Sequence, residues 1–194
     1  MILFATNNQH KLREVKEILP ALQWSFLGDF PQLAGMDPEE TGETFEANAK
    51  IKAVEFGNAS GVLTMADDSG LEVFALDGQP GVRSARWIPG SDEDRYLHLL
   101  QQLEGQQDRS AQFVSVLCLY DPRTKTEHFF RGEVQGKIID EPRGSGGFGY
   151  DAVFVPDGDE LTYAQLADEG RKHDYNHRRK SLDAFHDWWR QQSN

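Results

Sequence analysis

Short apolar runs along the chain alternate with segments whose apolar residues recur every three or four positions. Apolar runs bounded by turn-forming residues predict strands, and the longer spacing predicts helices that pack through one face. In residues 44–59, for example, Phe45, Ala49, Ala53 and Phe56 share one helical face. By these criteria, strands are expected at residues 1–6, 24–27, 62–66, 71–76, 111–120, 127–134 and 152–155. Helices are expected at residues 11–19, 44–59, 92–103, 163–169 and 177–191.

The order of these elements predicts the fold class. Strands alternate with helices in the first half of the chain, whereas residues 111–120 and 127–134 flank a turn and favour an antiparallel hairpin. We therefore expect an α/β fold with a mixed central sheet. Residues 1–194 are expected to form one domain, in which the hairpin, about residues 111–135, is a separate lobe that walls one side of a cleft.

Composition and charge narrow the classes of partner. The 194 residues carry 20 Lys and Arg against 32 Asp and Glu, a formal net charge of −12, which argues against nucleic acid as the partner. No apolar run approaches the length of about 20 residues that spans a bilayer. The apolar N-terminus turns polar at Asn7, too soon for a signal peptide, so a cytoplasmic protein is expected. The single cysteine, Cys118, lies in an apolar run and is expected to be buried.

Two adjacent carboxylates form the first candidate functional site, a metal-binding site. Asp67 and Asp68 follow an apolar strand and precede Ser69 and Gly70. Adjacent strand residues point to opposite faces, but a turn at Ser69-Gly70 would bring both carboxylates toward one ion. Mg²⁺ prefers such oxygen ligands. The alternative is a turn stabilised by the aspartate itself, with no ligand.

Two further segments have a phosphate-binding or a metal-binding interpretation. Residues 6–11 lead from a strand into a helix, where free N–H groups and Lys11 suit a phosphate; a plain helix cap with a surface lysine is the alternative. Glu40 lies before the second helix and is a metal ligand if its loop folds toward Asp68. It otherwise acts as an ordinary helix partner.

The last two segments indicate recognition of a base or a phosphate. Residues 144–151 place glycines around Phe148, which favours close approach to a flat ligand, with Asp151 available to read its edge; a flexible loop is the alternative. Lys172 and residues 177–180 form a basic cluster in an acidic chain, which suits phosphate, unless it is a solvated helix face.

Together these segments resemble the inosine triphosphate pyrophosphatase family, also described as non-standard purine NTP pyrophosphatases, from residue 1 to about residue 185. Each motif is short, but their joint order and spacing are specific. The matching motifs are Thr6-Asn7-Asn8 with Lys11, Glu40-Thr41-Gly42, Asn48-Ala49 with Lys52-Ala53, Ala66-Asp67-Asp68-Ser69-Gly70-Leu71, Pro80-Gly81-Val82, Ser84-Ala85-Arg86, Gly147-Phe148-Gly149-Tyr150-Asp151, and Lys172 with His177-Arg178.

The resemblance implies an elongated, two-lobed fold with the active site in the cleft between the lobes, and a homodimer. It implies hydrolysis of ITP, dITP, XTP and dXTP to the monophosphate and pyrophosphate, which removes them from the nucleotide pool. Asp68 would activate water, and Glu40 and Asp68 would hold Mg²⁺, with Asp67 as a further ligand candidate. The implied substrate-binding residues are Thr6, Asn7, Asn8, Gln9, His10 and Lys11 at the triphosphate, and Ser69, Phe148, Gly149, Tyr150, Asp151, Lys172, His177 and Arg178 elsewhere on the nucleotide.

Three positions depart from the family pattern. Ala47 replaces a usual Glu on the second helix, which would loosen support of the metal site. Asn176 replaces a usual Ser, and His173 replaces a frequent Asn. The last two put base preference in doubt more than reaction type. Two alternatives therefore stay open: a pyrophosphatase of modified pyrimidines or ordinary NTPs, and a catalytically silent nucleotide sensor.

Overall fold

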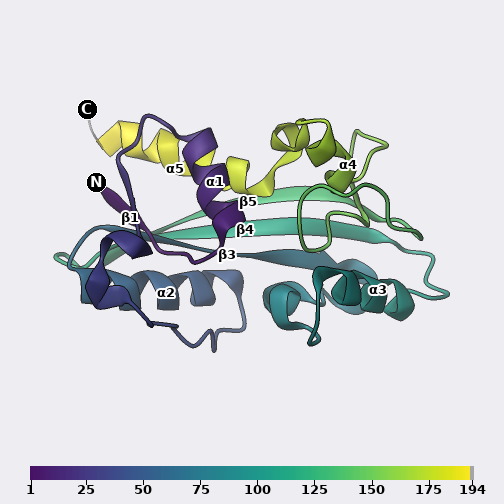
Figure 1. The fold of residues 1–194 in the computed structure, drawn as a ribbon, viewed down its shortest axis with the longest axis horizontal. Coiled ribbons are helices and arrows are strands. Elements are labelled where there is room, and N and C mark those ends of the chain that lie inside the picture. The colour runs from purple at the N-terminus through teal and green to yellow at the C-terminus, as the bar shows by residue number, and fades with distance from the viewer. Residues whose placement is uncertain (193–194) are drawn as a thin grey trace. The chain divides into compact units, whose positions relative to one another are not determined.

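The computed structural model describes residues 1–192, and within them the strands form one six-stranded sheet in the order β2-β1-β3-β4-β5-β6 (Figure 1). The strands are β1 (Ile2–Phe4), β2 (Trp24–Phe26), β3 (Thr64–Val73), β4 (Ser110–Asp121), β5 (Thr126–Ile138) and β6 (Phe154–Pro156). The α-helices are α1 (Gln9–Ile18), α2 (Phe45–Ser60), α3 (Asp92–Gln102), α4 (Tyr163–Asp168) and α5 (His177–Gln192). No helix among residues 1–192 is long and apolar enough to cross a membrane.

The sheet is mixed, which confirms the fold class predicted from the element order. Strand β1 pairs in parallel with β2 and with β3, whereas β5 and β6 pair antiparallel. Parallel neighbours need a crossover, and α1 and α2 provide those connections in the first third of the chain. The long β4 and β5 are joined by the predicted turn at residues 122–125.

Strand β3 differs from the sequence prediction. The predicted turn at Ser69-Gly70 is wrong, because the strand continues through both residues without interruption. The glycine serves a different purpose: a side chain at Gly70 would collide with the Gly81 carbonyl and with Ser84. Gly70 is therefore required for close packing within the strand.

The described chain divides into two compact units. The first holds residues 1–68, 115–132 and those from 178 onward, and the second holds residues 69–114 and 133–177. Strands β3, β4 and β5 each contribute residues to both units, as does the predicted hairpin lobe.

The first unit has helices on both faces of its strands. Figure 1 shows α1 and α5 on one face and α2 on the other. Its core is an aliphatic and aromatic cluster in which Phe4 contacts Trp24 edge-on, with ring centroids 5.9 Å apart. The buried members of the cluster are Ile2, Phe4, Val15, Leu19, Met65, Leu117, Leu119, Phe130, Leu182 and Phe185. Cys118 is buried and free, as predicted, and burial raises the pKa of its thiol to about 12.

The second unit carries α3 and α4 on opposite faces of its strands (Figure 1). Phe113 is at the centre of its core and stacks on Tyr163 with ring centroids 5.3 Å apart. Ser91 caps α3, because its hydroxyl accepts a hydrogen bond from the Asp94 N–H at 3.1 Å.

Candidate active site

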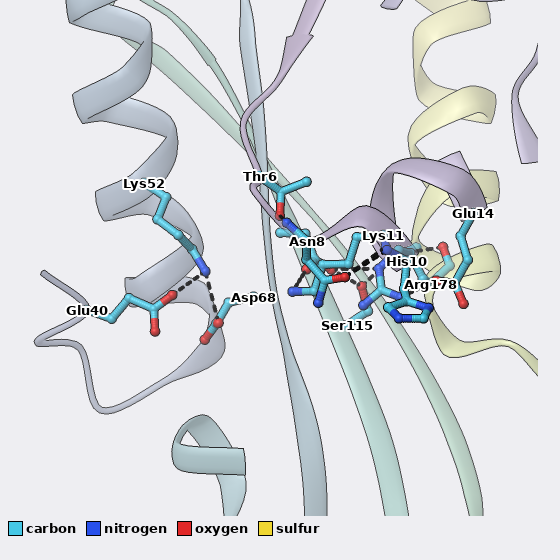
Figure 2. Close-up of polar contacts among 12 residues, drawn as sticks. Thr6, Asn8, His10, Lys11, Glu14, Glu40, Lys52, Asp68, Ser115 and Arg178 are labelled. Atoms are coloured by element: carbon cyan, nitrogen blue, oxygen red, sulfur yellow. Dashed lines mark hydrogen bonds and ion pairs between the residues drawn. The ribbon is translucent and has the colours of Figure 1, made fainter. Parts of the chain in front are cut away.

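Asp67 and Asp68 lie on β3 and point to opposite faces of the sheet, because the strand runs straight through them. The side chains that each carboxylate contacts confirm this separation. Asp67 contacts residues of α1 and α5, whereas Asp68 contacts Lys52 of α2. Figure 2 shows Lys52, Glu40 and Asp68 grouped together, apart from Lys11, Glu14, Arg178 and Ser115.

Asp67 is the centre of a buried ion-pair network. Its Oδ1 accepts from the Lys11 ammonium, and its Oδ2 accepts from the Ser115 hydroxyl at 2.9 Å and from Arg178 Nε at 3.1 Å. Arg178 also pairs with Glu14, and only 1% of its side chain is exposed. Both oxygens of Asp67 are therefore already engaged by this network.

The electrostatics of Asp67 follow from these partners. Burial alone would raise the pKa of its carboxyl, but the charges of Arg178 and Lys11 outweigh burial and hold the pKa far below its ordinary value. The Arg178 pKa is raised: burial would lower it, but Asp67 and Glu14 stabilise the cation. Asp67 is thus a permanently charged anchor for two cations.

Asp68 has a different environment. Its Oδ1 accepts from Lys52 Nζ at 3.1 Å, and the same ammonium donates to Glu40 at 2.5 Å. Its Oδ2 is buried and has no hydrogen-bond partner among residues 1–192. Burial raises the pKa of Asp68 above its ordinary value despite the opposing charges of Lys52 and Lys11. A buried carboxylate with a raised pKa and an unused oxygen is suited to accept a proton.

Lys52 joins the two carboxylates that the sequence proposed as metal ligands. Burial would lower its pKa, but Asp68 and Glu40 outweigh that effect and keep the amine protonated. In the described part of the chain, no three His, Cys, Asp or Glu side chains gather to hold a metal ion by themselves. Glu40 and Asp68 still fit Mg²⁺, which is commonly held by one or two carboxylates together with waters and substrate phosphates.

Hydrogen bonds of Asn8 hold the segment before α1 in place. Its side chain accepts from the backbone N–H groups of His10 and Lys11, at 2.9 and 3.3 Å, and its own N–H donates to Thr6 Oγ1 at 3.2 Å. The alternative interpretation of this segment as a helix cap therefore holds for Asn8. Asn7, Gln9 and His10 are exposed at the start of the helix.

In the second unit, three of the predicted site residues come together. Asp151 accepts from the Phe148 N–H at 2.9 Å and from Lys172 Nζ at 2.5 Å. The Lys172 ammonium lies 4.7 Å from the centre of the Phe148 ring. Asp92, which the sequence did not single out, accepts from the Gly149 N–H at 2.6 Å. The glycine-rich loop is thus held by two carboxylates.

The structure also places three other predicted site residues. Tyr150 is buried and its hydroxyl donates to the Ser84 carbonyl at 3.0 Å. The His177 ring is buried against Phe113, with centroids 5.0 Å apart and nearly parallel planes. Ser69 is half-buried on β3.

The sequence interpretation missed several partners. Glu14 lies three residues after Lys11 on α1, so the shared helix face was a readable signal. Ser115 lies 48 residues from Asp67, and Arg178 lies 111 residues from it, so no local pattern could have paired them. Arg178 was expected beside the base with His177, whereas the structure places it in the first unit against Asp67 and Glu14.

Comparison with known proteins identifies the family of the chain. The model of the Ham1 family matches residues 2–188. A dITP/XTP pyrophosphatase of Deinococcus deserti is 45% identical over 186 residues, which cover 95% of this chain and 86% of that protein. A dITP/XTP pyrophosphatase of Thermus thermophilus is 44% identical over 189 residues, which cover 95% of this chain and 89% of its own.

Solved structures give the same result. The Ham1 protein of Staphylococcus aureus superposes with a TM-score of 0.89 at 38% identity, covering 98% of each chain. A Mycobacterium abscessus nucleoside-triphosphatase, also described as a dITP/XTP pyrophosphatase, superposes with a TM-score of 0.74 at 40% identity and covers 89% of this chain and 92% of its own. The resemblance indicated by the motifs is confirmed, and the chain belongs to the Ham1 family.

Proposed function

We propose that this protein is a Mg²⁺-dependent nucleoside triphosphate pyrophosphatase that converts ITP, dITP, XTP and dXTP to the monophosphate and pyrophosphate. The names of its relatives support the reaction and the substrate class. The observation that carries the chemistry is Asp68, whose buried Oδ2 has no hydrogen-bond partner in the described chain and whose Oδ1 shares Lys52 with Glu40. In the cell, the enzyme would clear these nucleotides from the cytoplasmic pool.

Asp68 acts as the general base. A water molecule loses its proton to the Asp68 carboxylate as its oxygen attacks phosphorus, and the anhydride bond between the α- and β-phosphates breaks to release pyrophosphate. The Asp68 Oδ2 has no hydrogen-bond partner among residues 1–192 and is the atom placed to take this proton. The buried position keeps the reacting carboxylate away from bulk water.

Positive side chains neutralise the phosphates. Lys11 pairs with Asp67 and Lys52 pairs with Asp68, so both ammonium groups lie next to β3. Their placement lets the protein stabilise charge that develops as the anhydride breaks. Thr6 and residues 7–10 directly precede Lys11 in the chain and would contact the outer phosphates.

Glu40 and Asp68 are the proposed Mg²⁺ ligands. Asp67 is left out of this set, because both of its oxygens are already engaged by Lys11, Ser115 and Arg178. When bound, Mg²⁺ would add positive charge at the triphosphate and orient its oxygens. Two carboxylates suffice because the substrate supplies further oxygen ligands.

Phe148, Gly149, Asp151 and Lys172 are the proposed contacts of the base. The Phe148 ring offers a flat apolar face, and Asp151 and Lys172 form a buried charged pair beside it. Discrimination would depend on the 6-keto group of hypoxanthine and xanthine, because a site built to pair that group rejects the 6-amino group of adenine. Ser69, Tyr150 and His177 would support these contacts, whereas Arg178 would act through its ion pair with Asp67. The active form is proposed to be a homodimer.

Product analysis with ITP, XTP, GTP and ATP tests the proposal, with and without Mg²⁺. Metal-dependent release of pyrophosphate, much faster from ITP and XTP, is the expected result. Equal release from all four would support the proposed reaction but reject the base preference. The protein would then be a pyrophosphatase of ordinary NTPs as well. Binding without any release would reject the enzyme and favour a nucleotide sensor.

A further inference from the structure

Asn48, in the first turn of α2, is a polar residue at a position that is not exposed to solvent. It is fully buried, and its Oδ1 accepts a hydrogen bond from the Gly42 N–H at 2.8 Å. Its Nδ2 has no hydrogen-bond partner among residues 1–192. Asparagine is a poor helix former, and leaving a buried amide donor without a partner is unfavourable. An apolar residue would avoid that cost but could not accept the Gly42 N–H, so the acceptor oxygen is what asparagine contributes here.

The position of Asn48 connects it to the Glu40 loop. Asn48 and Lys52 are four residues apart on α2 and therefore share one helical face. Gly42 and Glu40 are two residues apart on the loop, and each is held by one member of this pair: Gly42 by Asn48, and Glu40 by Lys52 at 2.5 Å. Figure 2 shows Lys52 extending from α2 toward Glu40 and Asp68. The loop is thus fixed to the helix at two successive points.

The contact at Gly42 is tight enough to define the loop position. A Cβ on Gly42 would lie 2.6 Å from the Ala47 Cβ and 2.7 Å from Asn48 Oδ1. The Ala47 Cβ is fixed to the helix backbone, and the Asn48 backbone nitrogen would lie only 3.0 Å away, so a change of side-chain rotamer cannot relieve the clash. Any residue larger than glycine would push the loop off the helix and move Glu40 with it.

From these contacts we infer that Asn48 is a positioning residue, which acts through Gly42 to hold the Glu40 carboxylate where it can share a divalent cation with Asp68. The inference rests on the proposed Mg²⁺ site and adds a residue to which that proposal gives no role. Outer residues that orient a ligand commonly change metal affinity by about 10- to 100-fold when they are replaced.

Direct binding of Mn²⁺, followed by the electron paramagnetic resonance of the free ion, measures the site without turnover. Asn48→Ala is expected to weaken Mn²⁺ binding by about 10-fold or more. Asn48→Asp keeps an acceptor oxygen for the Gly42 N–H and replaces the amide that has no partner with a second oxygen, whose negative charge does not repel a cation. It is therefore expected to bind Mn²⁺ at least as tightly as the unaltered protein. Gly42→Ala disturbs the same contact from the loop side and is expected to resemble Asn48→Ala.

Asn58→Ala is the matched control. Asn58 is also on α2, and its Oδ1 accepts from the Tyr120 hydroxyl at 3.1 Å, so this variant removes one hydrogen bond from the same helix away from the loop. It is expected to leave Mn²⁺ affinity unchanged. Thermal denaturation of each variant separates loss of folding from loss of the site.

The outcomes distinguish this inference from the proposed function. If the unaltered protein releases pyrophosphate without any divalent cation and does not bind Mn²⁺, the metal site fails, and the role of Asn48 fails with it. If the unaltered protein binds Mn²⁺ and folded Asn48→Ala binds it equally, only the role of Asn48 is overturned. Loss of affinity in Asn48→Asp as well as Asn48→Ala would also overturn it, because the acceptor oxygen is retained.

Discussion

At the scale of single residues, Asp67 and Asp68 show how neighbours of identical chemistry acquire opposite properties. Asp67 is surrounded by cations and a hydroxyl, which hold its pKa far below the ordinary value. Asp68 has one shared ammonium and one unused oxygen, and burial raises its pKa. The same substitution at the two positions should therefore have different effects.

Asp68→Asn is expected to abolish pyrophosphate release and leave the fold intact. The raised pKa shows that folding disfavours the charged carboxylate, so its replacement by a neutral amide of the same shape removes little stability. Turnover falls because an amide cannot accept the proton from water. Product release and chemical denaturation, measured on the same preparation, check both parts; full activity in the folded variant would reject Asp68 as the base.

Asp67→Asn is expected to act mainly on stability. Removing the charge leaves Arg178 and Lys11 buried beside a neutral group, and breaking a buried pair in this way costs about 3–5 kcal/mol. Urea denaturation of the variant measures the loss. A variant as stable as the unaltered protein would show that the network contributes no net stability.

At the scale of elements, helix α2 carries both Asn48 and Lys52, and it begins at a defined cap. Thr44 has an extended backbone, and its hydroxyl accepts from the Ala47 N–H at 3.1 Å. The helix ends at Gly61, which adopts the left-handed conformation that favours glycine. Both boundaries are set by local chemistry and were close to those predicted from the sequence.

Thr44→Ala is expected to lower the free energy of unfolding by about 1 kcal/mol, because the N-cap acceptor is lost. Thr44→Ser is the control, since serine keeps the hydroxyl and caps helices at least as well as threonine. Denaturant titration of the two variants at constant pH measures the difference. Equal stability of the alanine and serine variants would mean that solvent replaces the cap.

The helices and most strands were predictable because each has its own local pattern of apolar residues. Strand β3 was not, since Ser69-Gly70 has the composition of a turn, and only the packing of Gly81 and Ser84 shows why the glycine is there. In the site, Lys11 and Glu40 could be proposed from their places beside helices. The contacts of Arg178 with Asp67 and Glu14 could not, because they join residues far apart in sequence.

At the scale of the whole molecule, the net charge of −12 produces a general repulsion that opposes compaction. The ion pairs of Asp67 are buried and are screened little by salt, whereas repulsion between exposed carboxylates is screened strongly within about 10 Å at 0.1 M ionic strength. The two effects separate when monovalent salt is added.

Potassium chloride between 0.02 and 0.3 M is expected to raise the melting temperature by a few degrees, because it relieves surface repulsion more than it weakens the buried pairs. Differential scanning calorimetry without divalent cations checks the direction. A falling melting temperature would show instead that attractive surface pairs dominate, and Asp67→Asn should respond to salt in the same way as the unaltered protein.

Because β3 runs straight through the two aspartates, the register of this strand in the sheet decides which residue occupies each of the two aspartate positions. A slip of one residue in one direction would put Asp68 in the place of Asp67 and Ser69 in the place of Asp68. A slip in the other direction would put Asp67 in the place of Asp68 and Ala66 in the place of Asp67. Either error keeps one aspartate and loses the other, so a misaligned chain has either the anchor without the base or the base without the anchor. Correct alignment is therefore a condition for activity that no single side chain can restore.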